Sequence, residues 1–171
     1  PFLRISTQMI ETIVLHQGLD AKAAKDRAIE MLKMAGIPAP EKRIDQYPHQ
    51  FSGGMRQRVM IAMSLSCNPE ILIADEPTSA LDVTIQAQIL DLMRDMTSRL
   101  GTAVILITHS LGVVAGMCDT LCVMYAGRVI ERGATTDLFA DAKHPYTQGL
   151  IKSVPRLDRA VSDRLFSIRG Q

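Results

Sequence analysis

The sequence has little cysteine and no strong excess of charge of either sign. Its 171 residues include 19 Lys and Arg against 18 Asp and Glu, a formal net charge of +1 at pH 7. Proteins that bind nucleic acid mainly through its phosphates carry a marked positive excess, so the charge balance excludes a strongly basic nucleic-acid-binding protein. Three cysteines are too few for a disulfide framework and indicate a reducing compartment, so we expect the cytoplasm.

A long, purely apolar run is also missing. The longest stretch without a charged residue, residues 100–118, has the length of a membrane span, but it contains three glycines and the polar residues Thr102, Thr108, His109 and Ser110. Polar groups are unfavourable at the centre of a bilayer. We therefore interpret this stretch as a strand, a turn and a helix.

The remaining composition is that of a folded protein. Hydrophobic residues make up 47% of the chain and charged residues 22%, which predicts a sizeable core. Apolar residues recur at helical spacing over residues 4–17 and 20–35, and Gly36-Ile37-Pro38 ends the second helix. Prolines and polar residues over 37–51 then predict a connection, so we place a subdomain boundary near residue 50.

Short apolar runs and helices alternate in the following part of the chain. Ser52 can cap a helix over about residues 53–67. The continuous apolar runs 71–74 and 103–107 are typical of strands that are buried on both faces of a sheet. Because an amphipathic helix over residues 81–100 separates them, the two strands are predicted to be parallel neighbours.

A hairpin is predicted nearer the end of the chain. Apolar residues alternate from Leu121 to Tyr125, Gly127 turns the chain, and Val129 and Ile130 lead it back. Together these patterns predict an α/β fold with a helical N-terminal part, a parallel sheet and a C-terminal hairpin.

Two adjacent carboxylates, Asp75 and Glu76, follow the first predicted strand. In a parallel sheet, ligands bind at the carboxyl ends of the strands. At such a position Asp75 can hold Mg²⁺, which prefers oxygen ligands, and Glu76 can polarise a water for attack on a phosphate. The simpler alternative is a strand end with two solvated acids.

Two further features suit a phosphate site. Ser52, Gly53 and Gly54 lead into a helix, whose N-terminal N–H groups attract anions, and glycines let a phosphate approach the backbone. His109 follows the second strand, where it can reach Asp75, Glu76 or a phosphate. Taken alone, each feature is explained better as an ordinary serine cap or a structural histidine. They are evidence for a phosphate site only because they occur together.

Taken together, these residues resemble the ATP-binding subunits of ABC transporters. Residues 51–55 (Phe-Ser-Gly-Gly-Met) match the signature motif, 71–76 look like Walker B, 79–82 (Ser-Ala-Leu-Asp) are similar to the D-loop, and His109 has the place of the switch histidine. The commonest signature is Leu-Ser-Gly-Gly-Gln. The variant here, and the ending over residues 144–158, resemble the branch of oligopeptide, dipeptide and nickel importers.

The resemblance implies a role for each of these residues. Asp75 would assist Mg²⁺, Glu76 would be the general base for the attacking water, and His109 would contact the γ-phosphate of the same ATP. Asp82 would lie at the interface with a second ATP-binding subunit, identical or homologous, and link the two sites. Four signature residues would contact the nucleotide bound to that partner: Ser52, Gly53, Gly54 and Met55.

The resemblance also implies an architecture built on the P-loop NTPase core. Residues 1–50 would form a helical subdomain that contacts membrane-spanning permease subunits, 51–133 would form the signature, Walker B, D-loop and switch part of the core, and 134–171 would be the extension of peptide importers. ATP and Mg²⁺ would be bound, a substrate-binding protein would take part indirectly, and nucleic acid would not be a partner. The subunit would lie peripherally on the cytoplasmic face of the membrane.

One part of a P-loop NTPase is missing. A P-loop needs Gly-x-x-x-x-Gly-Lys followed by Ser or Thr, but none of the eleven glycines precedes a lysine. The family's Q-loop is absent too, and the chain begins with Pro1. We therefore expect a piece of a longer subunit that is inactive alone.

Two other functions stay open. A soluble ABC ATPase that acts on DNA or ribosomes would share the signature and Walker B, but it would not be expected to have the ending over residues 144–158. A non-enzymatic fragment would only dock on a partner through its helical subdomain.

Two other groups of residues have simple interpretations. Cys118 and Cys122 have a spacing that on a helix suits a metal, but Cys122 falls in a predicted strand, so we interpret both as buried free thiols. We interpret the basic run over residues 56–58 as a solvated helix face, unless the nucleotide of a partner subunit lies near it.

Overall fold

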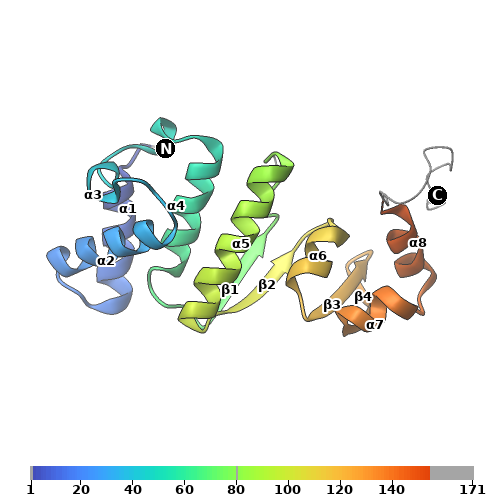
Figure 1. Ribbon diagram of the computed structural model, residues 1–171. Helices are drawn as coiled ribbons and strands as arrows, with labels where there is room; N and C mark the ends of the chain where they lie inside the picture. The colour runs from blue at the N-terminus through green and yellow to red at the C-terminus, as the bar shows by residue number, and fades with distance from the viewer. Residues whose placement is uncertain (1, 80, 155–171) are drawn as a thin grey trace. The chain divides into compact units, whose positions relative to one another are not determined.

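The computed structural model describes residues 2–79 and 81–154 (Figure 1). They belong to two compact units, one that ends at Ile107 and one that begins at Thr108. The boundary expected near residue 50 from the prolines and polar residues, and the boundary after residue 133 that the resemblance implies, remain predictions.

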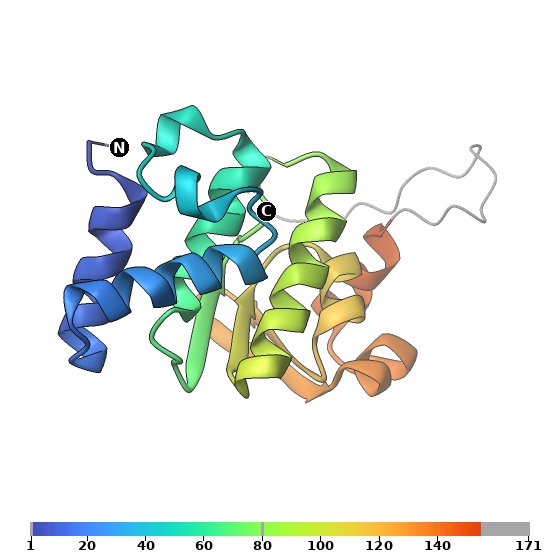
Figure 2. The ribbon, with the colours of Figure 1, turned by 60° about the vertical axis from the view of Figure 1, so that its left-hand side comes forward.

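Helices make up the first part of the first unit. Helix α1 (Ile5–Gln17) packs against α2 (Ala21–Met34), which also packs against α4 (Gly53–Leu65) (Figure 2). The short helix α3 (Pro40–Arg43) and the 3-10 turn η1 (Pro48–Gln50) lie in the connection between α2 and α4. The two helices predicted at the start of the chain are confirmed.

Local sequence explains where these helices begin and end. The Asp20 carboxylate accepts a hydrogen bond from the Ala23 N–H at 2.8 Å and caps α2. Ser52 caps α4 as predicted. Gly36 follows the end of α2 with a φ of +73°, a left-handed conformation that glycine adopts without steric cost.

The helical part has a core of aliphatic and methionine side chains. Burying one such side chain stabilises the fold by about 1.5–3 kcal/mol. Six of the fully buried side chains come from the three long helices: Ile5, Met9, Ile13, Met31, Leu32 and Leu65.

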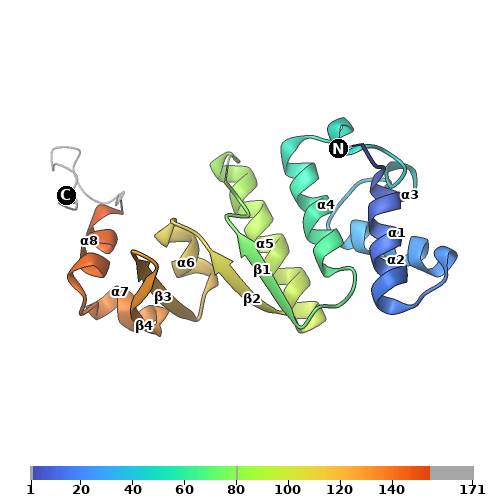
Figure 3. The ribbon, with the colours of Figure 1, turned by 180° about the vertical axis from the view of Figure 1, so that it is seen from behind.

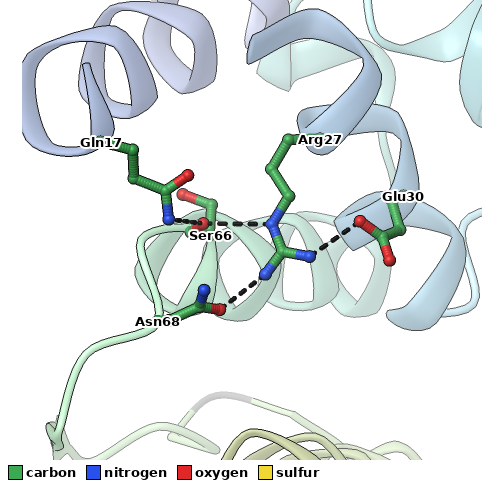
Figure 4. Close-up of polar contacts among 5 residues, drawn as sticks. All are labelled: Gln17, Arg27, Glu30, Ser66 and Asn68. Atoms are coloured by element: carbon green, nitrogen blue, oxygen red, sulfur yellow. Dashed lines mark hydrogen bonds and ion pairs between the residues drawn. The ribbon is translucent and has the colours of Figure 1, made fainter. Parts of the chain in front are cut away.

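A cluster of polar contacts holds the same three helices at the C-terminal end of α4 (Figure 4). Arg27 donates from Nη2 to the Asn68 side chain at 2.6 Å and from Nε to the Ser66 carbonyl at 3.4 Å. Its Nη1 pairs with Glu30 at 2.8 Å. Gln17 Nε2 also donates to the Ser66 carbonyl, at 3.3 Å. The cluster thus gives partners to a helix end whose last carbonyls have none inside the helix.

The second part of this unit is a parallel strand pair. Strands β1 (Ile71–Asp75) and β2 (Ala103–Ile107) are joined by α5 (Val83–Leu100), which confirms the predicted strand–helix–strand order. Their register sets Asp75 opposite Ile107, so the carboxyl ends of both strands coincide. Figures 1 and 3 show α5 lying along one face of the pair.

The expectation that these strands are buried on both faces was wrong. Side chains alternate between the faces of a strand, and only one face is covered within the described residues. The open face carries four isoleucines with the following exposed fractions: Ile71 56%, Ile73 66%, Ile105 51% and Ile107 49%. A continuous apolar run shows that two faces are apolar, but it does not show what covers each of them.

The second unit begins with the short helix α6 (Leu111–Met117). The strands β3 (Thr120–Tyr125) and β4 (Arg128–Ala134) follow as an antiparallel pair, which confirms the predicted hairpin. Helix α7 (Thr135–Asp141) packs against β4 and α6, and α8 (Pro145–Ser153) comes last. Among the described residues, no helix has the length and apolar character needed to cross a membrane.

The cysteines are free thiols, as expected, but they are not all buried. Cys118 is partly buried, and this burial, together with the nearby Asp119 carboxylate, raises the pKa of its thiol. Cys122 is exposed because it alternates with the buried Val123 along β3. The expectation of burial was therefore wrong for Cys122.

Candidate functional site

A pocket of about 480 Å³ lies at the N-terminal ends of α4 and α5. The fold brings together here all four predicted signature residues and the predicted D-loop aspartate. Four residues outside the predicted site set, among them Leu81 of the D-loop, complete the lining, which consists of Ser52, Gly53, Gly54, Met55, Arg58, Leu81, Asp82, Ile85 and Gln88.

Both helices begin at the pocket with a capped first turn. Ser52 Oγ accepts a hydrogen bond from the Met55 N–H at 3.4 Å, and Asp82 Oδ1 accepts one from the Ile85 N–H at 3.0 Å. Each cap uses one of the N–H groups that have no partner inside the helix. The remaining donors and the positive end of the dipole make the start of α4 suitable for an anion, whereas Asp82 acts as a cap for α5.

Gly54 is constrained by helix packing. A Cβ added to Gly54 would lie 2.9 Å from Cγ2 of Ile85, which is closer than side chains approach one another. At Gly53 the nearest atom, Cδ2 of Leu81, would be 3.9 Å away, an ordinary contact. The packing of α4 against α5 therefore gives a structural reason for glycine at position 54, while the contact of Gly53 and Gly54 with a phosphate remains a prediction.

The carboxylates Asp75 and Glu76 lie exposed at the end of β1. The Glu76 N–H donates to the Ile107 carbonyl at 2.9 Å, which extends the pairing with β2 by one residue. Ser79 donates from both N and Oγ to the Glu76 carbonyl. Glu76 has a φ of +44°, a left-handed conformation that costs a residue with a side chain about 1–3 kcal/mol. The predicted base is thus held in a strained backbone conformation.

The residues present fit part of a magnesium–nucleotide site. Within the part of the chain that the structure describes, no group of three or more His, Cys, Asp and Glu side chains can hold a metal. Asp75 offers carboxylate oxygens, which Mg²⁺ prefers, and the ion would take its other oxygen ligands from groups beyond Asp75 and Glu76, such as the phosphates of a nucleotide. This donor set fits an ion that arrives with a nucleotide.

His109 follows β2 by two residues and belongs to the second unit. The Thr108 hydroxyl beside it accepts a hydrogen bond from the Ser110 N–H at 3.1 Å. The role implied for His109 at the carboxylate end of β1 remains a prediction. Two parts of the resemblance, Ala80 of the D-loop and residues 155–158 of the ending, lie outside the described residues.

The interpretation of residues 56–58 as a solvated helix face holds for Arg56, which is exposed, but not for the half-buried Gln57 and Arg58. Arg56 donates from Nη1 to the Phe51 carbonyl at 2.7 Å. Gln57, which is half-buried, donates from Nε2 to the Pro77 carbonyl in the loop after Glu76. Sequence reasoning missed this contact because its two partners are 20 residues apart and neither residue type predicts it.

Arg58 connects α4 to two other helices. Its Nη1 donates to the Ala35 carbonyl at the end of α2, and its Nη2 donates to Gln88 of α5 at 3.4 Å. A Cβ added to Gly36 would lie 3.1 Å from Arg58 Nη1, so glycine at that position also leaves room for the guanidinium. The positively charged residue of the pocket lining is therefore fixed from both sides.

Two family models match the chain. One, described as ABC transporter, matches residues 2–79, and one, described as oligopeptide/dipeptide transporter, C-terminal region, matches residues 130–171. The oligopeptide transport ATP-binding protein OppD of Bacillus subtilis (strain 168) is 52% identical over 170 residues, which are 99% of this chain and 48% of that protein. The chain thus spans about half the length of the curated relatives that it matches.

Solved structures agree with this similarity. The protein cbiO1 of Clostridium perfringens, part of the ABC transporter complex cbiONQ, has a TM-score of 0.68 and 33% identity over 81% of this chain and 54% of its own. The ATP-binding cassette MJ0796, in a dimer bound to ADP and Pi, has a TM-score of 0.66 and 30% identity over 79% of this chain and 58% of its own. The expected α/β fold of an ABC ATPase core is confirmed, and the chain is similar over nearly its whole length to the ATP-binding proteins of ABC oligopeptide and dipeptide transporters.

Proposed function

We propose that these residues are part of an ATP-hydrolysing subunit that drives an ABC importer of oligopeptides or dipeptides. The observation that carries the proposal is the presence of two separate phosphate-directed features in one chain. One is the carboxylate pair at the end of a parallel strand, and the other is the capped Ser-Gly-Gly turn at the pocket. The similarity to OppD along nearly the whole chain favours peptides, and nickel is the alternative cargo.

In this proposal Glu76 is the general base. Its carboxylate takes a proton from the water that attacks the γ-phosphate of ATP, and His109 stabilises the charge that develops on that phosphate. Asp75 helps to hold Mg²⁺, which when bound neutralises phosphate charge. Phosphoryl transfer depends mainly on positioning and on charge neutralisation, so these three side chains suffice at this end of the nucleotide.

The pocket acts on a second nucleotide. Ser52, Gly53, Gly54 and Met55 contact the γ-phosphate of an ATP molecule held by a partner ATP-binding subunit, and Asp82 links the two sites across the interface. The dimer described for the similar cassette MJ0796, which is bound to ADP and Pi, supports a paired arrangement. Both nucleotides are then sandwiched between two copies of the fold, identical or homologous.

The helical part couples this chemistry to transport. Residues 1–50 contact the membrane-spanning permease subunits, which receive cargo from a separate substrate-binding protein, and residues 134–171 form the extension of peptide importers. The subunit therefore works peripherally on the cytoplasmic face of the membrane, without a nucleic-acid partner. The similarity to cbiO1, part of a transporter complex, supports association with membrane subunits.

The 171 residues lack a phosphate cradle, so we infer that they do not hydrolyse ATP by themselves. Isothermal titration of Mg²⁺-ATP into this chain, and into the complete subunit that contains it, tests this inference. We expect that the complete subunit binds Mg²⁺-ATP and that the short chain does not. Micromolar binding by the short chain would show that another segment cradles phosphate, and absence of binding to both would contradict the proposed function.

The choice of base is tested separately. In the complete subunit, Glu76→Gln keeps the size of the side chain but removes its basicity, so ATP turnover is expected to fall by about 100-fold or more. Normal turnover by this variant would rule out Glu76 as the base.

A further inference from the structure

We propose that Gln57 is a positioning residue for Glu76, so that the helix that begins at the pocket also holds the loop that carries the base. The proposal rests on the ATPase function proposed above. It concerns a residue outside the signature, Walker B, D-loop and switch positions.

The loop after β1 is anchored to the rest of the unit on both sides of the Glu76 side chain. Before it, the Glu76 N–H donates to the Ile107 carbonyl of β2 at 2.9 Å. After it, the Pro77 carbonyl accepts a hydrogen bond from Gln57 Nε2 of α4. The contact with Ser79 lies inside the loop and does not fix it to another element. The Gln57 hydrogen bond is thus a direct link between α4 and the backbone next to Glu76.

The backbone at Glu76 needs such an anchor. Its φ of +44° is strained for a residue with a side chain, and strain of this kind persists only where the surroundings enforce it. Pro77 has no N–H, so the next peptide nitrogen offers no hydrogen bond that would stabilise the turn. The Pro77 carbonyl is therefore the nearest backbone group after Glu76 that another element can hold.

Helix α4 links this anchor to the pocket. Its first turn presents Gly53, Gly54 and Met55 to the pocket, and Gln57 lies two residues later. Gly54 leaves no room for a side chain against Ile85, so the first turn of α4 packs closely on α5. Because Gln57 lies in the same helix, we expect a ligand that displaces this turn also to displace the Gln57 amide and, with it, the Pro77 carbonyl. Binding at the pocket and the placement of the base are coupled within one chain.

Three substitutions in the complete subunit test the role of the donated hydrogen bond. Gln57→Leu removes the donor at similar size, Gln57→Glu keeps the shape but only accepts hydrogen bonds when ionised, and Gln57→Lys restores a donor. We expect kcat for ATP hydrolysis to fall about 10- to 100-fold in the first two variants. A small displacement of a catalytic group slows the catalysed reaction by factors of this order. KM for ATP is expected to change less than about twofold, and the Lys variant is expected to recover part of the lost kcat.

Ser64→Ala is the matched control. Ser64 is exposed on the same helix, and its hydroxyl bonds only to the Met60 carbonyl within α4. Its kcat should equal that of the unchanged subunit. A purely structural role of Gln57 would lower the melting temperature, but it would not lower kcat at an unchanged KM in a way that the Lys variant recovers.

The outcomes separate this proposal from the proposed function. If Glu76→Gln abolishes turnover while Gln57→Leu and Gln57→Glu keep kcat within about twofold, the positioning role is wrong and the ATPase function stands. If Glu76→Gln turns over ATP normally, the assigned base itself is wrong. If Gln57→Leu does not fold, the Gln57→Glu and Gln57→Lys pair decides, because loss in the first and recovery in the second require a donor at this position.

Discussion

The helical part and the strand pair of the first unit bury their apolar residues to very different extents. Ile13 of α1 is completely buried, whereas Ile73 of β1 is 66% exposed, although both occupy strongly apolar stretches. The helices bury one apolar face of each against the others, although Leu15 of α1 stays 75% exposed, whereas the strands are covered on one face only within the described residues. Apolar pattern alone therefore predicts a secondary structure element and does not predict whether the chain supplies what covers it.

The largest expected difference between the two regions is in core stability. Ile13→Ala leaves a cavity among tightly packed helices and is expected to lower the free energy of unfolding by about 2–5 kcal/mol. Ile73→Ala removes the same atoms from an exposed position, so its effect should stay within about 0.5 kcal/mol. Urea unfolding followed by circular dichroism measures both. Equal losses would mean that the open face of the strands is covered in solution.

A second difference concerns polar contacts. Arg27→Met breaks three contacts at the end of α4 and leaves the Asn68 and Glu30 side chains without this partner. We therefore expect the free energy of unfolding to fall by about 1–3 kcal/mol. The control is Arg99→Met, which removes an exposed ion pair with Asp95 and should cost less than about 1 kcal/mol. The same unfolding experiment compares them. A loss for Arg99→Met as large as that for Arg27→Met would contradict this assignment.

The helical part should also carry a pH-dependent contribution. The Ser6 hydroxyl, and after it the Lys25 ammonium, lower the pKa of Asp45. A carboxylate with a lowered pKa stabilises the fold above its unfolded value of about 4, and this stabilisation disappears as the pH falls through the folded value. Melting temperatures of the unchanged chain and of Asp45→Asn should therefore differ at pH 7 and converge on acidification. A constant difference between pH 7 and pH 3 would exclude this titration.

The smallest effect on stability is expected at the open face of the strands. Ile73→Thr and Ile105→Thr keep β-branched side chains but reduce the exposed apolar area. The free energy of unfolding should therefore change by less than about 0.5 kcal/mol. Self-association should decrease, because contiguous exposed apolar patches promote it. Light scattering at increasing concentration measures this change. Unaltered association would show that the isoleucine face does not mediate it.

The comparison also shows how far the sequence predicts the structure. Helix and strand positions were predictable because each depends on local signals, such as the Ser52 cap and the apolar runs. The site was predictable in outline, since Asp82 and the Ser-Gly-Gly turn do line one pocket. Sequence reasoning could not predict the contact of Gln57 with Pro77, nor that of Arg58 with Ala35, because each joins residues more than a helix apart.

The left-handed backbone of Glu76 lowers thermal stability at a position where the proposed activity requires glutamate. Glycine at this position would adopt the same conformation without strain, so Glu76→Gly would relieve the local backbone strain while it removes the proposed base. A laboratory selection for heat resistance alone would then enrich glycine at position 76 and yield a hardier protein without turnover. Selection for heat resistance and turnover together would have to find its gains elsewhere, and position 76 would stay glutamate.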